Sequence, residues 1–346
     1  MSTFFNSVHI TNFKSLKDVT LNDCRRINLL IGKPNVGKSN ILEAIGLFGL
    51  NYSRLNKNKK LTQFVRFDNT PELFFDGDTN APITVAINDD GNEPSCRVDY
   101  QNLNHKNFND TIQLFDKQLV ISLFIDGAYS KLTVNNDLEL DIIEFGGFYN
   151  IKQYKFTHNP ALEKLNIPYL MPPFGVNLLN VIQEHKHLKK TLSGIFAEYG
   201  LKLVFDTANQ ALKIMKEIKD SEVFLLPYYS IADTLQRIIF FKTAIASNED
   251  SILLFEEPEA HCFPPYITHI AKEIISSETN QFFIATHSPY ILDAFLENAH
   301  VDLAIFMADF KDGQTVIKRL TDDELNDVYE YGLDLFFNAE LFTDEI

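Results

Sequence analysis

The chain has 346 residues and carries 47 acidic against 31 basic side chains, which gives a formal net charge of −16. Such an acidic chain repels nucleic acid on average. Its three scattered cysteines lack the spacing of a zinc site or a disulfide framework, so we expect reduced thiols and a cytoplasmic protein. No apolar run approaches the roughly 20 residues of a membrane-spanning helix, and the N-terminus lacks a secretory signal pattern, so we expect no membrane partner.

The first part of the chain combines short strands with a glycine loop. Residues 4–13 and 17–22 predict two strands around a turn, and residues 26–31 predict a buried strand. A helix is expected from residue 39 to about residue 50. The polar and basic segment 51–60 that follows is typical of an exposed loop.

The pattern becomes strand-rich from residue 64 to about residue 148, and we expect an antiparallel sheet there. The predicted strands of this region are 83–87, 97–100, 119–125 and 138–145. After an irregular stretch, residues 177–199 predict two helices, and residues 201–206 and 222–226 predict strands.

From residue 231 onward, buried strands alternate with helices. The predicted helices are 231–246, 266–275, 289–296 and 322–331, and the predicted strands are 251–255, 281–285, 301–307 and 314–318. This alternation is typical of an α/β core with a parallel sheet, here interrupted in its early half by the strand-rich region.

A glycine loop between a predicted strand and a predicted helix fits G-x-x-x-x-G-K-[ST], in the context that this motif requires. Its glycines allow successive N–H groups to point into one concavity, where a phosphate can bind near the helix N-terminus. Lys38 would reach the outer phosphates, and Ser39 would hold the Mg²⁺ that accompanies them. The alternative is an accidental Gly-Lys turn. The residues expected to bind the nucleotide are Gly32, Lys33, Pro34, Asn35, Val36, Gly37, Lys38, Ser39 and Asn40.

Two carboxylates follow the predicted strand 251–255. Glu256 is expected to orient Mg²⁺, and Glu257 to polarise the water that attacks the γ-phosphate. Because adjacent strand positions point to opposite sides, the strand end must twist or unwind for both to serve one site, and Pro258 is compatible with such an end. His287 ends the next core strand and is placed to contact the γ-phosphate or the water. The alternatives are an acidic strand-to-loop transition and a structural histidine.

These three motifs together resemble the ABC-type ATPase heads, in the branch that contains RecF, the SMC proteins and the OLD (overcoming lysogenisation defect) ATPases. The resemblance extends to residues 10–16, from which Lys14 is carried over as a nucleotide-binding residue. The sequence of residues 256–261, Glu-Glu-Pro-Glu-Ala-His, is more typical of OLD-like ATPases, although Glu256 stands where most relatives carry Asp. The resemblance implies an α/β fold: an ABC-ATPase head with a parallel P-loop sheet flanked by helices, an antiparallel β lobe and a short helical insertion.

The resemblance implies a single ABC-type ATPase domain over residues 1–346. Lobe I spans 1–153, a short helical and β insertion spans 154–229 in place of a coiled coil, and lobe II spans 230–346. The insertion holds only about 75 residues without heptads, which excludes a long SMC-type clamp. Since about 60 residues follow His287, fewer than the nuclease domain of many OLD proteins needs, we expect any nuclease to be a separate polypeptide.

Two elements of the family are weaker in this chain. Gln153 is the candidate for the Q-loop glutamine and thus for a metal ligand. Residues 229–237 lie where the signature stretch belongs, but Ala232 occupies the serine position and no glycine pair is present. The residues expected to cap the following helix and to present N–H groups to a partner's nucleotide are Ser230, Asp233 and Thr234. An ordinary capped core helix is the alternative.

In this family two heads sandwich two nucleotides, so the resemblance implies an ATP-dependent homodimer or higher homo-oligomer. The expected function is an ATP-hydrolysing switch that forms ADP and phosphate, with Glu257, His287 and Lys38 as catalytic residues. Its expected setting is antiphage defence or DNA maintenance, with a separately encoded effector such as a nuclease or toxin.

Two alternatives stay open. The first is an ATP-gated scaffold without turnover, and the second is a transporter nucleotide-binding subunit, which the missing Leu-Ser-Gly-Gly-Gln signature disfavours. Direct DNA binding also stays open, since the net charge opposes it and only residues 54–60 form a basic cluster.

Overall fold

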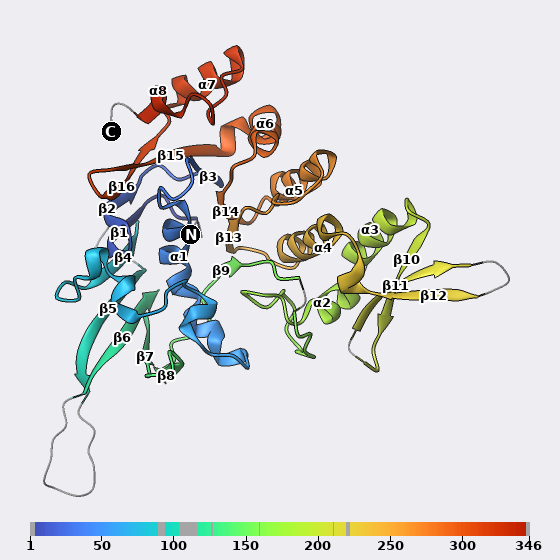
Figure 1. Cartoon of the computed structure of the whole chain (residues 1–346), viewed down its shortest axis with the longest axis horizontal. Helices are drawn as coiled ribbons and strands as arrows, with labels where there is room; N and C mark the ends of the chain where they lie inside the picture. The colour runs from blue at the N-terminus through green and yellow to red at the C-terminus, as the bar shows by residue number, and fades with distance from the viewer. Residues whose placement is uncertain are drawn as a thin grey trace, which may run out of the picture.

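The computed structural model describes residues 4–88, 94–103, 116–125, 127–158, 160–209, 211–218 and 222–343. These residues form three sheets, and the arm that carries the smallest sheet projects from the rest of the molecule (Figure 1). Within the described ranges, no helix has both the length and the apolar character needed to cross a bilayer.

The central sheet has the strand order β16-β15-β3-β14-β13-β9, with β16 antiparallel at one edge. Its strands are β3 (Ile27–Gly32), β9 (Ile151–Tyr154), β13 (Ile252–Glu256), β14 (Gln281–Ala285), β15 (Leu303–Lys311) and β16 (Gln314–Arg319). Both β3 and β14 are buried along their whole length, as expected for strands that are covered on both faces. The predicted α/β core with a parallel sheet is therefore confirmed.

Helices pack on both faces of this sheet. Leu29 of β3 belongs to one hydrophobic core and its neighbour Leu30 to the other, because successive side chains of a strand point to opposite faces. One face packs against α1 (Lys38–Gly46), which continues as a 3₁₀ segment, η1 (Leu47–Leu55). Three helices cover the other face: α4 (Asp233–Ala246), α5 (Pro264–Ser276) and α6 (Pro289–Asn298).

A second, antiparallel sheet shares the core of α1 and has the strand order β2-β1-β4-β5-β6-β7-β8. Its strands are β1 (Val8–Phe13), β2 (Leu16–Leu21), β4 (Ile83–Ile87), β5 (Ser95–Leu103), β6 (Asp116–Ile125), β7 (Ala128–Val134) and β8 (Leu140–Glu144). The predicted antiparallel region is present, although β7 was not expected as a separate strand.

Short 3₁₀ helices occur in several connections of the chain. They are η2 (Leu61–Gln63), η3 (Thr70–Leu73), η4 (Phe75–Gly77), η6 (Tyr228–Ser230) and η7 (His300–Asp302).

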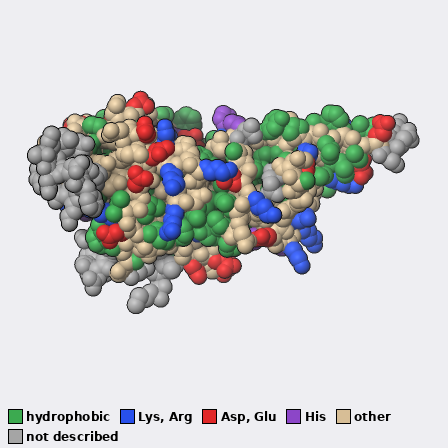
Figure 2. All heavy atoms as spheres, turned by 90° about the horizontal axis from the view of Figure 1, so that it is seen from below, with side chains coloured by type: hydrophobic (Ala, Val, Ile, Leu, Met, Phe, Trp, Pro, Cys, Tyr) green, Lys and Arg blue, Asp and Glu red, His purple; other side chains and the backbone are tan. Residues whose placement is uncertain are grey.

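The projecting arm contains two helices and a three-stranded antiparallel sheet in the order β10-β11-β12. Its elements are α2 (Leu178–Glu184), α3 (Lys186–Ala197), β10 (Leu201–Asp206), β11 (Ala211–Glu217) and β12 (Val223–Pro227). Figure 2 shows hydrophobic side chains along this arm, and residues 223–225 of the edge strand β12 are about half exposed. The sequence pattern missed β11, which joins the two predicted strands.

The last described segment contains α7 (Asp322–Tyr331) and α8 (Ala339–Thr343). A reciprocal capping box between Thr321 and Glu324 starts α7, and Gly332 ends it in the left-handed conformation. The Lys33 ammonium forms an exposed ion pair of 2.9 Å with Glu340 of α8. This pair links α8 to the loop that connects β3 with α1.

Candidate active site

The loop between β3 and α1 depends on two glycines. A Cβ atom at Gly32 would lie 2.2 Å from the carbonyl oxygen of Ala308. Gly37 has a φ of 98°, and a Cβ there would lie 2.1 Å from the Thr315 hydroxyl. Both positions therefore require glycine, since atoms of β15 and β16 lie too near the loop to leave room for a Cβ atom.

The N-terminus of α1 faces the hollow of this loop. Gly37 occupies the N-cap position, so no side chain caps the first turn, and that turn carries no acidic residue. The first N–H groups of a helix have no partners within the helix itself, and together with the helix dipole they favour an anion. The loop therefore has the chemistry of a phosphate-binding site.

Lys38 is held at the centre of the loop. Its ammonium donates to the carbonyl oxygens of Gly32 and Lys33, each at 2.8 Å, and the residue is 5% exposed. Burial lowers the pKa of Lys38 to about 8, against the opposing effect of Glu257 and Glu256. The side chain thus places a desolvated ammonium where a nucleotide phosphate would bind.

Most of the predicted residues line one pocket of about 450 Å³. The residues that line it are Ser15, Pro34, Asn35, Val36, Gly37, Lys38, Ser39, Asn40, Arg66, Glu256, Glu257, Ala285 and His287. Gly32 and Lys33 are not among them. Gly32 is the last residue of β3, and its carbonyl oxygen accepts from Lys38. The Lys33 carbonyl also accepts from Lys38, while the Lys33 side chain pairs with Glu340.

The strand end that carries the two carboxylates is unwound, as the sequence required. Glu256 is the last residue of β13, and Glu257 adopts a left-handed backbone with a φ of 43°. The Glu257 N–H donates to the Ala285 carbonyl at 2.8 Å, which pins this conformation to β14. A left-handed non-glycine residue costs free energy and is typical of functional sites. Here it brings both side chains to one pocket.

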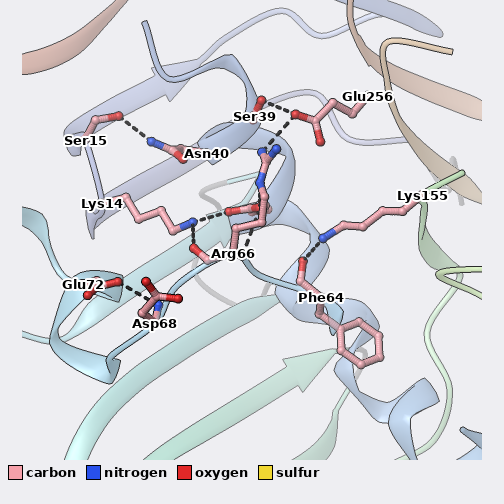
Figure 3. Close-up of polar contacts among 11 residues, drawn as sticks. Lys14, Ser15, Ser39, Asn40, Phe64, Arg66, Asp68, Glu72, Lys155 and Glu256 are labelled. Atoms are coloured by element: carbon pink, nitrogen blue, oxygen red, sulfur yellow. Dashed lines mark hydrogen bonds and ion pairs between the residues drawn. The ribbon is translucent and has the colours of Figure 1, made fainter. Parts of the chain in front are cut away.

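A pair of oxygen donors suited to Mg²⁺ lies at the N-terminus of α1. The Ser39 hydroxyl donates to Oε1 of Glu256, and Arg66 donates to the same oxygen from Nη2 at 2.9 Å (Figure 3). Mg²⁺ in nucleotide sites takes few protein oxygens and keeps phosphate and water ligands. The described residues contain no cluster of three or more His, Cys, Asp or Glu that would form a metal cage of its own. Ser39 and Glu256 thus fit a metal that arrives with the nucleotide.

His287 follows β14, between the loop and the carboxylates. Its Nε2 lies 3.6 Å from Oε1 of Glu257. Burial and then the charge of Lys38 lower the pKa of His287 below 6.5, and Glu257 opposes them. At neutral pH the ring is therefore uncharged and able to donate one hydrogen bond toward the pocket.

A buried carboxylate that the sequence analysis missed organises one wall. Glu43 of α1 is fully buried and pairs with Lys14 at 2.5 Å and with Nε of Arg66 at 2.8 Å. The Lys14 ammonium also donates to the Arg66 carbonyl, so the prediction that Lys14 binds the nucleotide is not supported by its position (Figure 3). Its neighbour Ser15 lines the pocket instead, and accepts a hydrogen bond from Asn40 at 2.7 Å.

Gln153 does not reach the predicted metal site. It is buried in β9, where its amide oxygen lies 2.9 Å from the position of a Cβ at Gly46. Gly46 ends α1, about 10 Å along the helix axis from Ser39 at 1.5 Å per residue. The amide has no hydrogen-bond partner among the described residues, and the pocket lining does not include it. The residue two positions later, Lys155, follows the end of β9, and its ammonium is directed to the Phe64 carbonyl oxygen (Figure 3).

The three signature candidates do not cap α4, which corrects the expectation. Ala232 is the N-cap residue, without a side-chain hydrogen bond. The Ser230 hydroxyl donates to the Pro227 carbonyl, and the Thr234 hydroxyl donates to the His261 carbonyl at 3.0 Å. The Asp233 carboxylate instead forms ion pairs, with Arg237 at 2.9 Å and with His158 at 3.0 Å. None of the three lines the pocket of its own chain.

Comparisons with known proteins match the chain to a family model and to two curated relatives. The family model described as "AAA domain, putative AbiEii toxin, Type IV TA system" matches residues 27–293. A DNA replication and repair protein RecF of Caldanaerobacter subterraneus subsp. tengcongensis is 37% identical over 65 residues, 19% of this chain and 17% of that protein. An uncharacterized protein of Methanocaldococcus jannaschii is 43% identical over 42 residues, 12% of this chain and 19% of that protein. The matched part thus spans less than a fifth of these curated relatives.

Two solved structures show the same fold. One is the SMC head bound to the C-winged helix domain of ScpA, with 18% identity and a TM-score of 0.50 over 92% of this chain and 98% of that one. The other is the SMC head domain with an extended coiled coil, bound to the C-terminal domain of ScpA derived from Pyrococcus furiosus. It has 14% identity and a TM-score of 0.50 over 95% of this chain and 99% of that one.

Proposed function

Since this chain belongs to the family of AAA domains whose match spans residues 27–293, we propose that it hydrolyses ATP and uses the cycle as a conformational switch. The fold is that of an ABC-type ATPase head of the SMC and RecF branch. The single observation that carries the proposal is the left-handed backbone of Glu257. It turns a carboxylate toward the pocket that also holds Lys38 and His287.

Each residue of the pocket would have a distinct role in hydrolysis. The loop N–H groups and Lys38 bind and orient the phosphates, and Ser39 with Glu256 would hold Mg²⁺, which neutralises phosphate charge when bound. Glu257 accepts the proton of the attacking water. Neutral His287, whose Nε2 lies 3.6 Å from Oε1 of Glu257, would donate a hydrogen bond to the γ-phosphate or to the attacking water.

We also propose that two copies assemble around the nucleotides. Support comes from α4, whose first turn has no side-chain cap and so keeps N–H groups available to a phosphate from another chain, and Arg237 balances the charge of Asp233 in that turn. The hydrogen bond from Thr234 to His261 ties this helix end to the loop that follows Glu257. Residues 1–153 and 230–346 would act as the two lobes, with the arm 154–229 between them.

The biological setting that we propose is antiphage defence or DNA maintenance, together with a separate effector protein. The OLD-like sequence of residues 256–261 supports this setting. So do the family description, which names a toxin–antitoxin system, and the RecF relative, which is named for DNA replication and repair. The SMC heads bound to domains of ScpA offer a precedent for a head that recruits a second polypeptide.

The testing experiment is steady-state ATP turnover with Mg²⁺, for the wild type beside Glu257→Gln. We expect the variant to bind ATP, to turn over at least about 100-fold more slowly, and to accumulate as a dimer in size-exclusion chromatography. The exposed Glu278→Gln is the matched control and should behave as the wild type. If the wild type binds ATP without turnover, the hydrolase proposal fails and the scaffold alternative takes its place.

A further inference from the structure

A second pocket of about 520 Å³ adjoins the nucleotide pocket. The two share Arg66, Glu256 and Glu257, so these side chains form a common wall. On its other sides the second pocket is lined by residues that include Thr62, Gln63, Lys155, Phe156 and Arg237. We call it the cationic pocket, because it contains three basic side chains with hydroxyl and amide groups beside them.

The basic side chains of this pocket differ in their partners. Arg66 is paired with Glu43 and Glu256. Arg237 is paired with Asp233 at 2.9 Å and lies over the ring of Phe156, 4.5 Å from its centroid. The charge of each arginine is therefore balanced by a carboxylate.

Lys155 is different. It follows the last residue of β9, and its ammonium donates to the Phe64 carbonyl oxygen at 2.6 Å (Figure 3). Across the described part of the chain, no carboxylate forms an ion pair with it. A carbonyl oxygen is neutral and uses one of the three ammonium donors, so the positive charge and two donors stay available. A half-buried cation in this state binds an anion favourably.

We propose that the cationic pocket receives the inorganic phosphate that hydrolysis releases, and that Lys155 binds it. This inference rests on the proposed function. In the reaction, the water oxygen bonds to the γ-phosphorus, the bond from that phosphorus to the bridging oxygen breaks, and ADP leaves with that oxygen. The water proton passes to Glu257 and then to solvent. The product is a free anion beside two carboxylates, and the unbalanced cation lies on the other side of the wall that those carboxylates form.

The position of Lys155 differs from that of Gln153. Gln153 lies within β9 and stays beneath α1, whereas Lys155 follows the last residue of the strand and lines the pocket. The chain thus presents a cation where the sequence led us to expect a metal-binding amide.

The test measures phosphate as a ligand and as a product inhibitor. Isothermal titration of inorganic phosphate into the ADP-bound chain, and inhibition of turnover by added phosphate, are compared for the wild type, Lys155→Gln and Lys155→Arg. We expect the glutamine variant to weaken both effects about tenfold, and the arginine variant to keep most of them, since one charge-assisted hydrogen bond is at stake. The exposed Lys164→Gln is the control and should change neither.

Several outcomes would overturn the inference. One is an unchanged phosphate affinity in Lys155→Gln, provided that circular dichroism shows the variant to be folded. Another is loss of ATP binding in the same variant. If that variant does not fold, Lys155→Met and Thr62→Val serve instead, and unchanged phosphate binding in both folded variants would overturn the inference. Lys155-dependent binding of a short oligonucleotide, without binding of free phosphate, would assign the pocket to nucleic acid. Absence of turnover would overturn the proposed function, whereas the titration still tests the pocket.

Discussion

Arg66 and Glu256, separated by 190 positions in the sequence, are joined by a hydrogen bond of 2.9 Å from Nη2 to Oε1. Glu256 is the carboxylate expected to orient Mg²⁺, so a metal at this oxygen competes with a guanidinium. The side chain of Arg66 is about half exposed, which allows it to move away from Glu256.

Replacement of Arg66 should therefore change the requirement for metal. In Arg66→Met we expect the Mg²⁺ concentration for half-maximal ATP binding to fall by roughly threefold to tenfold, because the competing cation is gone. A magnesium titration with a fluorescent ATP analogue measures it. Arg54→Met, at an exposed position in the last turn of η1, is the control. A higher requirement for Mg²⁺ in Arg66→Met would show that Arg66 assists the metal site instead.

Gly37→Ala should damage the phosphate loop more than its small size suggests. The new Cβ would meet the Thr315 hydroxyl at 2.1 Å, on a backbone with a φ of 98°. We expect ATP affinity to fall by roughly tenfold to 100-fold, since strain of this kind costs about 1–3 kcal/mol. Gly313→Ala is a matched control, because Gly313 also has a positive φ, of 79°, but its Cβ would meet nothing within 4 Å. Equal effects of the two changes on ATP binding would contradict this account.

Glu43→Gln should destabilise the whole chain. The carboxylate is fully buried and pairs with Lys14 and Arg66, so its loss removes the ion pair of Lys14 and leaves Arg66 with Glu256 alone. We expect a loss of about 1–3 kcal/mol in the free energy of unfolding, measured by urea denaturation. The exposed pair of Lys33 with Glu340 is the comparison, and Glu340→Gln should leave the urea midpoint unchanged. Equal midpoints for Glu43→Gln and the wild type would refute the role assigned to Glu43.

Turnover should depend on the protonation of His287. Burial and the charge of Lys38 lower its pKa below 6.5, so the neutral ring prevails at pH 7. As the pH falls through the lowered pKa, the ring gains a proton and a second positive charge appears beside Lys38. We therefore expect turnover to fall on the acid side with a midpoint below 6.5, and His287→Gln to lose that limb of the profile. An acid limb that persists unchanged in the variant would assign the titration to another group.

The same shift has a consequence for stability. Between the folded pKa and 6.5, the unfolded chain binds more protons at His287 than the folded chain does, so the stability of the folded state rises with pH across this window. Above pH 6.5 neither the folded nor the unfolded chain is protonated at His287, so this residue no longer makes the stability depend on pH. His287→Gln should flatten this part of the curve of unfolding free energy against pH.

The sequence was sufficient to predict those parts of the fold and of the site that depend on a local pattern. The phosphate loop, the buried strands 251–255 and 281–285, and the carboxylates that follow the first of them are contiguous segments with strong periodicity. Their place in a parallel sheet followed from the rule that the carboxyl ends of parallel strands meet at one edge. The structure confirms the fold and brings most of these residues to one pocket.

The residues that were missed depend on distant neighbours. Arg66 lies in a loop with no motif, and its role is visible only once Glu43 and Glu256 are placed beside it. Lys155 lies two positions after Gln153, just past the end of β9, and the sequence alone does not show where the strand ends or which of the two side chains reaches the pocket. A lone arginine and a lone lysine after apolar residues gave no signal in the sequence.

The strand order of the central sheet fixes the distances between the phosphate loop, His287 and Glu257. Because β14 lies between β3 and β13, His287 is interposed between the phosphate loop and Glu257. The separation of the three motifs is set by the backbone ladder, about 4.8 Å from strand to strand, and not by the length of any connection. The central sheet therefore sets the distances between the three motifs, and insertions in the arm or in the antiparallel sheet leave these distances unchanged.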